Sequence, residues 1–510
     1  MRNIVSKLSC CFTLLLVAYS TIKAQPNGFY NVKAYGAKGD GENLDTKAID
    51  KAIETAAAAG GGTVYFPAGN YLSVTIHLKS NVGLFLDQGS TLIASEKGYD
   101  LPEKNANEIY QDYGHSHFHN SLIVGENLEN ITIAGPGKIW GKGLLRTSKK
   151  NTVNEGFGNK TISLKLCRNV ILRDFTVQHG GWFVFLLTGV DNLTIDNIKM
   201  DTNRDGMDII SCKNVRVSNC FVNSPEDDGI CLKSDYALNY ARATENVTIT
   251  NCQVSGYDEG SFLEGTYKRD SNAVMKGKPI GRIKLGTESN GGFKNITISN
   301  CVFDYCRGLA LETVDGALLE DVTISNITMR DIVNSPIFVR LGARMRGPEG
   351  TPVGSIKRVI ISNIIAYNVD ARQAAFISGV PGHQIEDLTF NNIRVYFKGE
   401  GTKEQAATQV PELEKGYPEP DTFGSTPSYS FFIRHVKDLK MSDVEVSFIK
   451  PDLRPAYFLE DIDGADFQHI RASKIEGAAT FMLKHVKDFN IYNSKLIPDT
   501  VLNDVAAKEL

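Results

Sequence analysis

The chain alternates apolar and polar residues in short runs that recur along most of its length. Each run reads as Asn or Asp, an apolar residue, Thr or a similar residue, Ile and then Asn, which is the two-residue period of a strand with one buried face. The clearest copies are NLENITIAG (127–135), VDNLTIDNI (190–198), CKNVRVSNC (212–220), TENVTITNC (244–252), FKNITISNC (293–301) and LEDVTISNI (319–327). Weaker copies are IKRVIISNI (356–364), IEDLTFNNI (385–393), VKDLKMSDV (436–444) and KDFNIYNSK (487–495). Spacings of about 22 to 32 residues predict an all-β chain folded as a parallel β-solenoid and not as a sandwich.

One segment near the start has the period of a helix instead. Residues 45–59 place five apolar side chains on one helical face, and three glycines at 60–62 end the segment. The five residues are Ala48, Ile49, Ala52, Ile53 and Ala56. A solenoid needs its open end covered, because bare strand edges and core residues would otherwise face water. We therefore expect a short helix that caps the N-terminal end.

The first residues have the composition of an export signal. Basic residues precede an apolar stretch over residues 8–18, and a cleavage point follows Ala24. The apolar stretch is too short to span a bilayer. We therefore predict residues 1–24 as a signal peptide and residues 25–510 as one exported domain, periplasmic or extracellular, without a membrane span and monomeric.

Charge and cysteine content argue against several classes of partner and against a disulfide or metal framework. The net charge is −4 in 510 residues, without a long basic run, which argues against nucleic acid or an anionic membrane surface as a partner. Seven cysteines follow the predicted signal, and most lie in strand-like runs, so we expect apolar packing inside the solenoid rather than a disulfide framework. One bridge is the alternative, either Cys301 to Cys306 or Cys212 to Cys220. No Cys-x-x-Cys spacing indicates a metal site.

Three carboxylates in two neighbouring repeats carry the main signal for chemistry. Asp205 lies in NRDGMD (203–208). Asp227 and Asp228 follow in PEDDGICLK (225–233), about 22 residues later, which is the length of one solenoid turn. Residues one turn apart stack on the same face, so we expect the three acids to converge. Carboxylates that lie close together repel one another, so their pKa values move apart. One acid can then donate a proton while another acts as a base, and cleavage of a glycosidic bond requires such a pair.

The segment 180–234 resembles the catalytic core of glycoside hydrolase family 28, the polygalacturonases, and suggests a divergent bacterial subgroup. Its Asn203-Arg204-Asp205 resembles the family's Asn-Thr-Asp, with Arg in place of Thr, and Asp227-Asp228 matches its Asp-Asp. The resemblance implies that Asp228, or the other acid of the pair, protonates the leaving oxygen. Asp205 and Asp227 would then hold and deprotonate the attacking water, which inverts the anomeric carbon. An inverting pair lies about 6.5–9.5 Å apart, a separation that neighbouring coils can supply.

Two N-terminal segments extend the resemblance to the fold. NVKAYGAKGDG (31–41) and TVYFPAGNYL (63–72) resemble the N-terminal part of pectate-lyase-like proteins. This resemblance, and not the period alone, implies a right-handed parallel β-helix.

The family's other two motifs, Gly-His-Gly and Arg-Ile-Lys, leave two registers open. No Gly-His-Gly is present after Asp228, and Asp258 or Ile280 takes the place of the family's His. In the first register, Arg282-Ile283-Lys284 matches Arg-Ile-Lys. We predict that Arg282 and Lys284 bind substrate by clamping a sugar carboxylate, and a solvated strand pair is the alternative.

The second register uses a later segment. Here Gly286 to Gly292 resembles the residues directly after the family's His, and Arg307-Gly308-Leu309-Ala310-Leu311-Glu312 occupies the Arg-Ile-Lys coil. Ala and Glu then replace the two cations. Glu288 and Glu312 would face the cleft in this register.

Weaker candidates are Trp182, His115, His117, His119, Arg340, Arg344 and Arg346. We interpret the tryptophan as core rather than a sugar platform, and the histidines as a loop in the sugar cleft rather than a metal comb. The arginines either bind a second acidic sugar or form a surface turn. Segments 96–120, 264–282 and 400–428 lack the repeat and are predicted as excursion loops. The first two would wall one end of the cleft, which favours exo attack.

Together these patterns predict a hydrolase that cleaves α-galacturonosidic bonds in pectic oligo- or polysaccharide, either polygalacturonan or rhamnogalacturonan fragments. We expect no cofactor and no metal. A pectate lyase is one alternative; it would use Ca²⁺ held by Asp residues, an Arg base and β-elimination. A non-catalytic carbohydrate-binding solenoid is the other, although it would not need three clustered acids.

Overall fold

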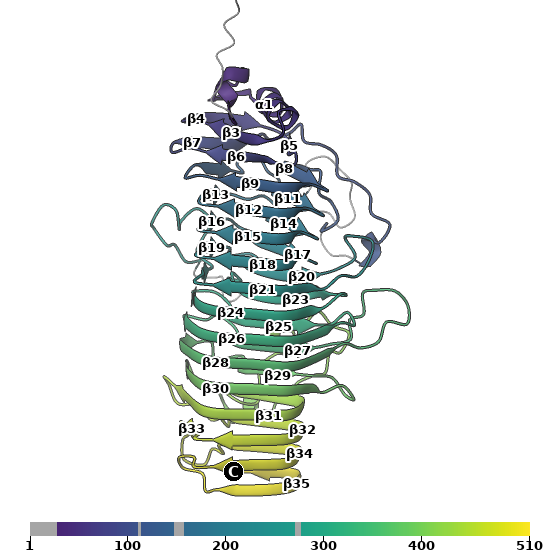
Figure 1. Cartoon of the computed structure of the whole chain (residues 1–510). Helices are drawn as coiled ribbons and strands as arrows, with labels where there is room; N and C mark the ends of the chain where they lie inside the picture. Colours follow the sequence, from purple (N-terminus) through teal and green to yellow (C-terminus); the bar gives the residue numbers. More distant parts are fainter. Residues whose placement is uncertain (1–27, 111–113, 147–157, 271–276) are drawn as a thin grey trace, which may run out of the picture.

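The computed structural model describes residues 28–110, 114–146, 158–270 and 277–510. These residues form a right-handed parallel β-helix, in which coils stack from the N-terminal helix to the C-terminus (Figure 1). The predicted fold class is confirmed. The predicted signal peptide, residues 1–24, lies outside the described residues.

Strands of successive coils pair in parallel and build three ladders along the stack. The first ladder contains β5 (Ile76–His77), β8 (Ser121–Glu126), β11 (Lys160–Lys165), β14 (Phe183–Thr188), β17 (Met207–Ile210), β20 (Ile230–Ser234), β23 (Ile283–Ser289), β25 (Leu309–Thr313), β27 (Ile337–Leu341) and β29 (Ala375–Ser378). The second contains β1 (Phe29–Asn31), β3 (Gly62–Phe66), β6 (Val82–Leu86), β9 (Glu129–Ala134), β12 (Arg168–Arg173), β15 (Asp191–Asp196), β18 (Lys213–Ser218), β21 (Thr244–Thr250), β24 (Phe293–Asp304), β26 (Leu318–Arg330), β28 (Ser355–Val369) and β30 (Ile385–Phe397). The third contains β2 (Asp40–Leu44), β4 (Gly69–Ser73), β7 (Ser90–Ala94), β10 (Lys138–Trp140), β13 (Thr176–Gln178), β16 (Lys199–Asp201), β19 (Phe221–Asn223) and β22 (Gln253–Ser255).

Longer strands replace the separate short ones towards the C-terminus. β24 already pairs with both β21 and β22, so one strand serves the second and third ladders. β31 (Phe431–Phe448), β32 (Tyr457–Gln468) and β34 (Phe481–Tyr492) likewise span more than one side of the coil, and β33 (Arg471–Ala472) pairs with the end of β31. The last strand, β35 (Thr500–Glu509), pairs antiparallel with β34 and ends the stack.

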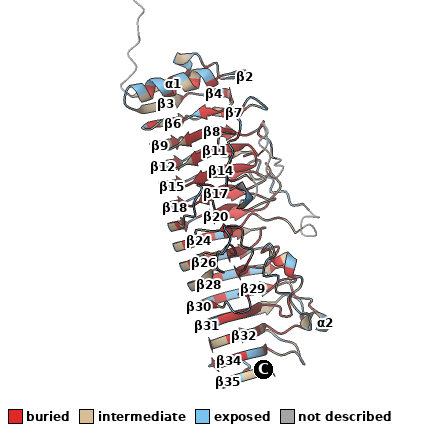
Figure 2. Ribbon diagram, turned by 90° about the vertical axis from the view of Figure 1, so that its right-hand side faces the viewer, coloured by how far each residue is buried: buried red, intermediate tan, exposed pale blue. Residues whose placement is uncertain are grey.

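The inward-facing side chains of the three ladders form one continuous hydrophobic core. Buried residues recur on the strands along the stack (Figure 2). The repeat found in the sequence lies on these strands and alternates as expected: in β15, Leu193 and Ile195 are buried and Asn192 is exposed. Asparagines recur at positions with left-handed backbone angles, which they tolerate better than most residues. Asn192 and Asn214 have φ values of 53° and 58°. The Asn214 amide donates a hydrogen bond to Asn192 Oδ1 at 3.1 Å, one rung of an exposed side-chain ladder.

The N-terminal end of the stack is covered by a helix, as predicted. α1 (Thr46–Ala58) follows the short 3-10 helix η1 (Val32–Tyr35) and β2. Ile49, Ala52, Ile53 and Ala56 are buried, whereas Ala48 is only half-buried. The buried face of α1 therefore shields the first coil from water.

All seven cysteines after the predicted signal are free and buried. The alternative of one bridge, Cys301 to Cys306 or Cys212 to Cys220, is therefore wrong, and the cysteines pack as small apolar side chains. Within the described part of the chain, no helix has the length and apolar character to cross a membrane.

The three predicted excursions leave the coils where the repeat breaks, and their described parts lie on one side of the stack in the view of Figure 2. The segment 96–120 connects β7 to β8 and contains η2 (Glu108–Tyr110). The segment 264–282 precedes β23, and 400–428 separates β30 from β31. The last contains α2 (Lys403–Ala406) and η4 (Pro420–Phe423). These loops bring distant residues to the first ladder.

Candidate active site

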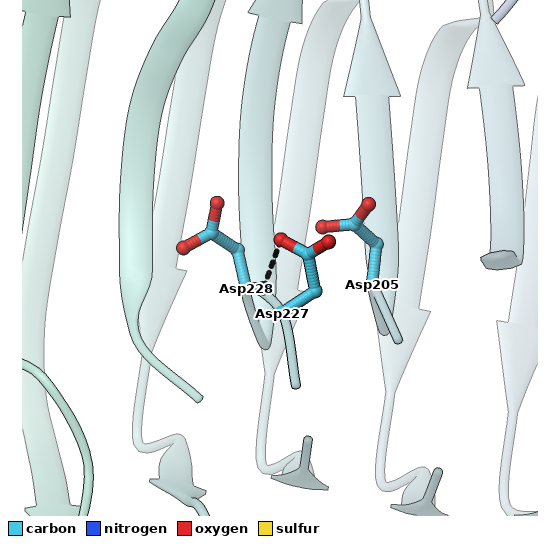
Figure 3. Close-up of side chains that lie close together, drawn as sticks. All are labelled: Asp205, Asp227 and Asp228. Carbon is cyan, nitrogen blue, oxygen red and sulfur yellow. Dashed lines mark hydrogen bonds between the residues drawn. The ribbon is translucent and has the colours of Figure 1, made fainter. Parts of the chain in front are cut away.

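The three acids lie in the turns that precede β17 and β20, on neighbouring coils (Figure 3). The register of β17 on β20 puts Asp205 and Asp228 at equivalent positions, and Asp227 level with Arg204. One oxygen atom from each of the three carboxylates lies within 4.8 Å of the others. Because the acids lie in turns and not within strands, the side chains of Asp227 and Asp228 point to the same side (Figure 3). The structure therefore brings together the three residues that the sequence singled out.

Asp228 is buried, with 4% of its surface exposed, and it contacts two cations of the next coil. Arg282 Nε donates to Asp228 Oδ1 at 2.7 Å, and Lys284 Nζ lies 3.5 Å from Oδ2. Burial alone would raise the pKa of Asp228, but Lys284 and Arg282 outweigh it and hold the pKa well below its ordinary value. Asp228 is therefore a carboxylate, which can accept a proton but has none to donate.

Asp205 has the opposite environment. It is 3% exposed, and the nearest cation, Lys233, lies 3.9 Å from its Oδ2. Oδ1 has no hydrogen-bond partner among the described residues. Burial, together with the charges of Asp208 and Asp227, raises the pKa of Asp205 well above its ordinary value. Two acids at equivalent positions thus have pKa values that are moved in opposite directions.

Asp227 is the most accessible acid of the three, since 23% of its side chain is exposed. Its Oδ2 pairs with Arg204 Nη2 at 2.6 Å, and its Oδ1 accepts a hydrogen bond from the Asp228 backbone N–H at 3.0 Å. The guanidinium of Arg204 lies over the ring of Trp182, 3.8 Å from its centroid. Trp182 is itself 7% exposed and packs in a small apolar cluster with Phe183, so it is largely core, as interpreted from the sequence.

Arg282 and Lys284 lie in the coil directly after the acid pair, at and just before the start of β23. Both are buried, and both contact protein carboxylates beyond Asp228: Glu312 lies 4.0 Å from Arg282 and 3.4 Å from Lys284. The register of β20 on β23 puts Ile280 level with Asp227, so the two cations occupy the coil expected for the family's Gly-His-Gly. Glu312 lies on the following coil, in β25, and faces both cations. The site therefore contains Arg282 and Lys284, as in the first register, and also Glu312, as in the second. The predicted role of the two cations as a carboxylate clamp stays a prediction.

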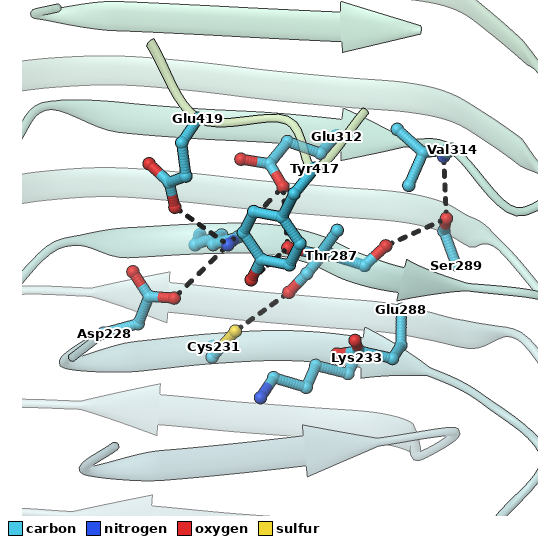
Figure 4. A network of polar contacts seen from close by, with 12 residues as sticks. Asp228, Cys231, Lys233, Thr287, Glu288, Ser289, Glu312, Val314, Tyr417 and Glu419 are labelled. Atoms are coloured by element: carbon cyan, nitrogen blue, oxygen red, sulfur yellow. Dashed lines mark hydrogen bonds and ion pairs between the residues drawn. The ribbon is translucent and has the colours of Figure 1, made fainter. Parts of the chain in front are cut away.

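The loop 400–428 returns over these cations (Figure 4). Glu419 Oε1 accepts a hydrogen bond from Arg282 Nη2 at 2.5 Å, and Arg307 also pairs with Glu419. Thr287 Oγ1 and Tyr417 Oη form a hydrogen bond at 3.1 Å. Burial would raise the pKa of Glu419, but Arg282 and Arg307 lower it to about 2, so the loop is held by ion pairs. Sequence reasoning missed Glu419, because it is 137 residues away from Arg282 and no motif surrounds it.

A second buried polar cluster supports Asp205. Lys233 Nζ lies 2.8 Å from Asp208 Oδ1 and 3.0 Å from His115 Nε2. His115 is fully buried and comes from the loop 96–120, so this loop packs against the site. Sequence reasoning did not select Asp208 or Lys233, although both are charged residues within otherwise apolar strands, which was an available signal.

Two of the three arginines of the segment 340–346, Arg340 and Arg344, are bound within the protein. Arg340 Nη2 donates to the backbone carbonyl of Glu412 at 2.6 Å, which fixes the loop 400–428 to β27. Arg344 Nη2 donates to Asp315 at 2.5 Å. Both side chains therefore support the loops around the first ladder.

The three acids also form the one group of metal-ligand type found among the described residues. Each acid, however, faces at least one protein cation: Asp227 faces Arg204, Asp228 faces Arg282 and Lys284, and Asp205 faces Lys233. These positive charges weaken the attraction of the cluster for a divalent cation. The donor set thus fits proton transfer better than Ca²⁺ binding.

Known proteins share both the sequence pattern and the fold. A family model described as rhamnogalacturonase A/epimerase, pectate lyase-like, matches residues 29–312. A probable polygalacturonase of Vitis vinifera is 24% identical over 72% of this chain and 74% of its own length. An exo-poly-alpha-D-galacturonosidase of Dickeya chrysanthemi is also 24% identical, over 71% of both chains. The family 28 exopolygalacturonase of Yersinia enterocolitica has the same fold, with a TM-score of 0.65 and 18% identity over 88% of this chain and 79% of its own.

Proposed function

The chain belongs to the rhamnogalacturonase A/epimerase, pectate lyase-like family, and we propose that it hydrolyses α-galacturonosidic bonds in pectic oligo- or polysaccharide. The predicted resemblance to the polygalacturonases is confirmed by relatives named polygalacturonase and exo-poly-alpha-D-galacturonosidase, and by the fold shared with a family 28 exopolygalacturonase. The observation that carries the proposal is the acid cluster itself. It combines two buried carboxyls whose pKa values are moved in opposite directions with a third, more exposed one. Such a cluster can hold a proton donor and a base together.

The attacking water binds between Asp205 and Asp228. A water that donates to two acceptors at about 2.8 Å each places them roughly 4.4 Å apart. The carboxylate oxygens of the cluster lie within 4.8 Å of one another, which suits one shared water. Asp228 then removes the proton of this water, because Arg282 and Lys284 keep it ionised.

Asp227 protonates the leaving oxygen. The two cations beside Asp228 support Asp227 as the donor, a choice that the sequence left open. Asp205 can carry a proton, but only 4% of its side chain is exposed, compared with 23% for Asp227. A glycosidic oxygen outside the coil can therefore approach Asp227 more easily. The closest oxygens of the three acids lie within 4.8 Å of one another, nearer than the about 6.5–9.5 Å expected from the sequence for an inverting pair. Inversion is proposed because the nucleophile is the water shared by Asp205 and Asp228, which attacks the anomeric carbon from the side opposite the leaving oxygen.

We further propose that the enzyme is exo-acting, exported to the periplasm or the extracellular space, and monomeric. Exo attack is supported by the loops 96–120 and 400–428, which pack against the site through His115 and Glu419. An exo-acting relative is consistent with it. Export is supported by the signal-like residues 1–24.

Product analysis on polygalacturonate tests the proposal against its alternatives. Hydrolysis releases reducing ends without a rise in ultraviolet absorbance, and a chelator leaves the rate unchanged. Elimination instead yields an unsaturated, absorbing sugar, and a chelator that stops it would establish the Ca²⁺-dependent lyase. Binding without any product would establish the carbohydrate-binding solenoid. Asp228→Asn, which keeps the shape of the side chain, serves as the inactive control.

A further inference from the structure

Arg204 lies between an aromatic ring and a carboxylate of the acid cluster. The registers of β14 on β17 and of β17 on β20 put Trp182, Arg204 and Asp227 at equivalent positions of three consecutive coils. Arg204 lies between its two neighbours: its guanidinium stacks on the indole ring at 3.8 Å and pairs with the carboxylate at 2.6 Å. It also stands where the family motif has Thr. A long cation thus replaces a short hydroxyl directly beside the acid assigned as proton donor.

This ion pair conflicts with proton donation. The guanidinium occupies Asp227 Oδ2 at 2.6 Å, and Asp227 Oδ1 accepts a hydrogen bond from the Asp228 backbone N–H at 3.0 Å. Both carboxylate oxygens of Asp227 are therefore engaged by protein donors, and neither is turned towards a glycosidic oxygen. Catalysis requires Arg204 to leave Asp227 before the proton is transferred.

A uronic acid supplies the alternative partner. Its carboxylate offers a planar, two-oxygen acceptor that matches the fork of the guanidinium. Arg204 is 23% exposed, so it can reach a ligand on the outside of the coil. Arg282 and Lys284, in contrast, are 2% and 3% exposed and are already paired with Asp228. Arg204 is therefore the cation of the cluster that a sugar carboxylate can approach.

We propose that Arg204 recognises the carboxylate of a galacturonic acid unit beside the scissile bond and thereby releases Asp227 for protonation. This inference rests on the proposed function. Once released, Asp227 takes up a proton from solvent and passes it to the glycosidic oxygen as the bond from that oxygen to the anomeric carbon breaks. The shared water forms the new bond to this carbon, and its proton goes to Asp228. Arg204 then returns to Asp227 when the product leaves.

The exchange of partners predicts a coupling that binding measurements can detect without turnover. In Asp227→Asn, Arg204 no longer has to break an ion pair before it binds the ligand. With Asp228→Asn present in every protein to prevent hydrolysis, we expect titration calorimetry with tri-galacturonate to show a Kd about 5-fold lower when Asp227→Asn is added, the scale of a partly exposed ion pair. In the Arg204→Thr background the same Asp227→Asn change should leave the Kd unaltered. Equal effects of Asp227→Asn in both backgrounds would overturn the proposal.

A fluorescence measurement provides a second readout. The chain has two tryptophans, so Trp140→Phe leaves Trp182 as the reporter of the stacked guanidinium. Galacturonate should change this emission and galactose should not, and Arg204→Thr should abolish the response. An equal response to both sugars, or one that persists in Arg204→Thr, contradicts the exchange. Arg216→Thr, an exposed arginine on β18, is the matched control.

These outcomes separate the inference from the proposed function. If the wild type yields no hydrolysis product, the proposed function fails whatever the binding shows. If hydrolysis occurs but the double-mutant cycle shows no coupling, the role of Arg204 fails alone. A purely structural role would lower the thermal stability of Arg204→Thr without changing its preference for galacturonate over galactose.

Discussion

Replacing Glu312 by Gln tests the electrostatics of the site through the stability of the fold. Glu312 is fully buried; it accepts a hydrogen bond from Thr287 Oγ1 at 3.0 Å and lies 3.4 Å from Lys284. Burial, only partly offset by Lys284 and Arg282, raises its pKa from the ordinary value of 4.5 to about 7. Between these two pH values the folded protein keeps a proton that the unfolded chain loses.

The sign and size of the effect follow from this difference. Below the unfolded pKa of 4.5 both states are protonated, and the contribution of this group to stability is complete. As the pH rises to the folded pKa of about 7, the contribution is lost at about 1.4 kcal/mol per pH unit, about 3 kcal/mol in all. Gln cannot ionise and shows no such loss. The free energy of unfolding of Glu312→Gln, relative to the wild type, should therefore rise by about 3 kcal/mol across this window.

Urea denaturation followed by circular dichroism, at unit steps of pH, measures this difference. Glu386→Gln, an exposed carboxyl on β30, is the matched control and should run parallel to the wild type. The reasoning is refuted if the Glu312→Gln and wild-type curves also remain parallel from pH 4.5 to 7.

Three further predictions concern catalysis. Asp228→Asn and Asp227→Asn should each lower kcat by about 10²–10⁴, because each loses a proton-transfer group, and near-normal kcat in both would remove the pair from the mechanism. Arg282→Ala should lower kcat more than it raises KM, because it acts on Asp228; a change in KM alone would favour the carboxylate clamp predicted from the sequence. Tyr417→Ala together with Glu419→Ala should loosen the loop 400–428 and shift products from monomers to longer oligomers, and an unchanged product profile would count against this loop as the determinant of exo attack.

The architecture was readable from the sequence because each coil repeats the same local rule. In β15, buried Leu193 and Ile195 alternate with polar neighbours, and a left-handed Asn192 precedes the buried pair. Such a pattern depends only on residues close in the chain. The right-handedness of the coil was predicted from the resemblance of the N-terminal segments to pectate-lyase-like proteins, because the period alone does not distinguish a right-handed from a left-handed coil.

The candidate site was only partly readable for a related reason. The acids Asp205 and Asp228 are one coil apart, so spacing alone placed them together. The state of Asp228 depends on Arg282, which arrives through a loop of irregular length, and on Glu419 beyond it. Contacts between distant loops leave no period in the sequence. The burial that raises the pKa of Asp205 is likewise a property of the assembled stack.

The most direct test of catalysis by the acid cluster is the configuration of the first-formed product. An α-galacturonide is hydrolysed in the NMR tube, and the anomeric signals are followed before mutarotation mixes them. A water held between Asp205 and Asp228, with Asp227 as donor, predicts the β-anomer of galacturonate. The α-anomer would mean that a carboxylate attacks the sugar directly, and an unsaturated sugar would mean elimination; either result contradicts the mechanism.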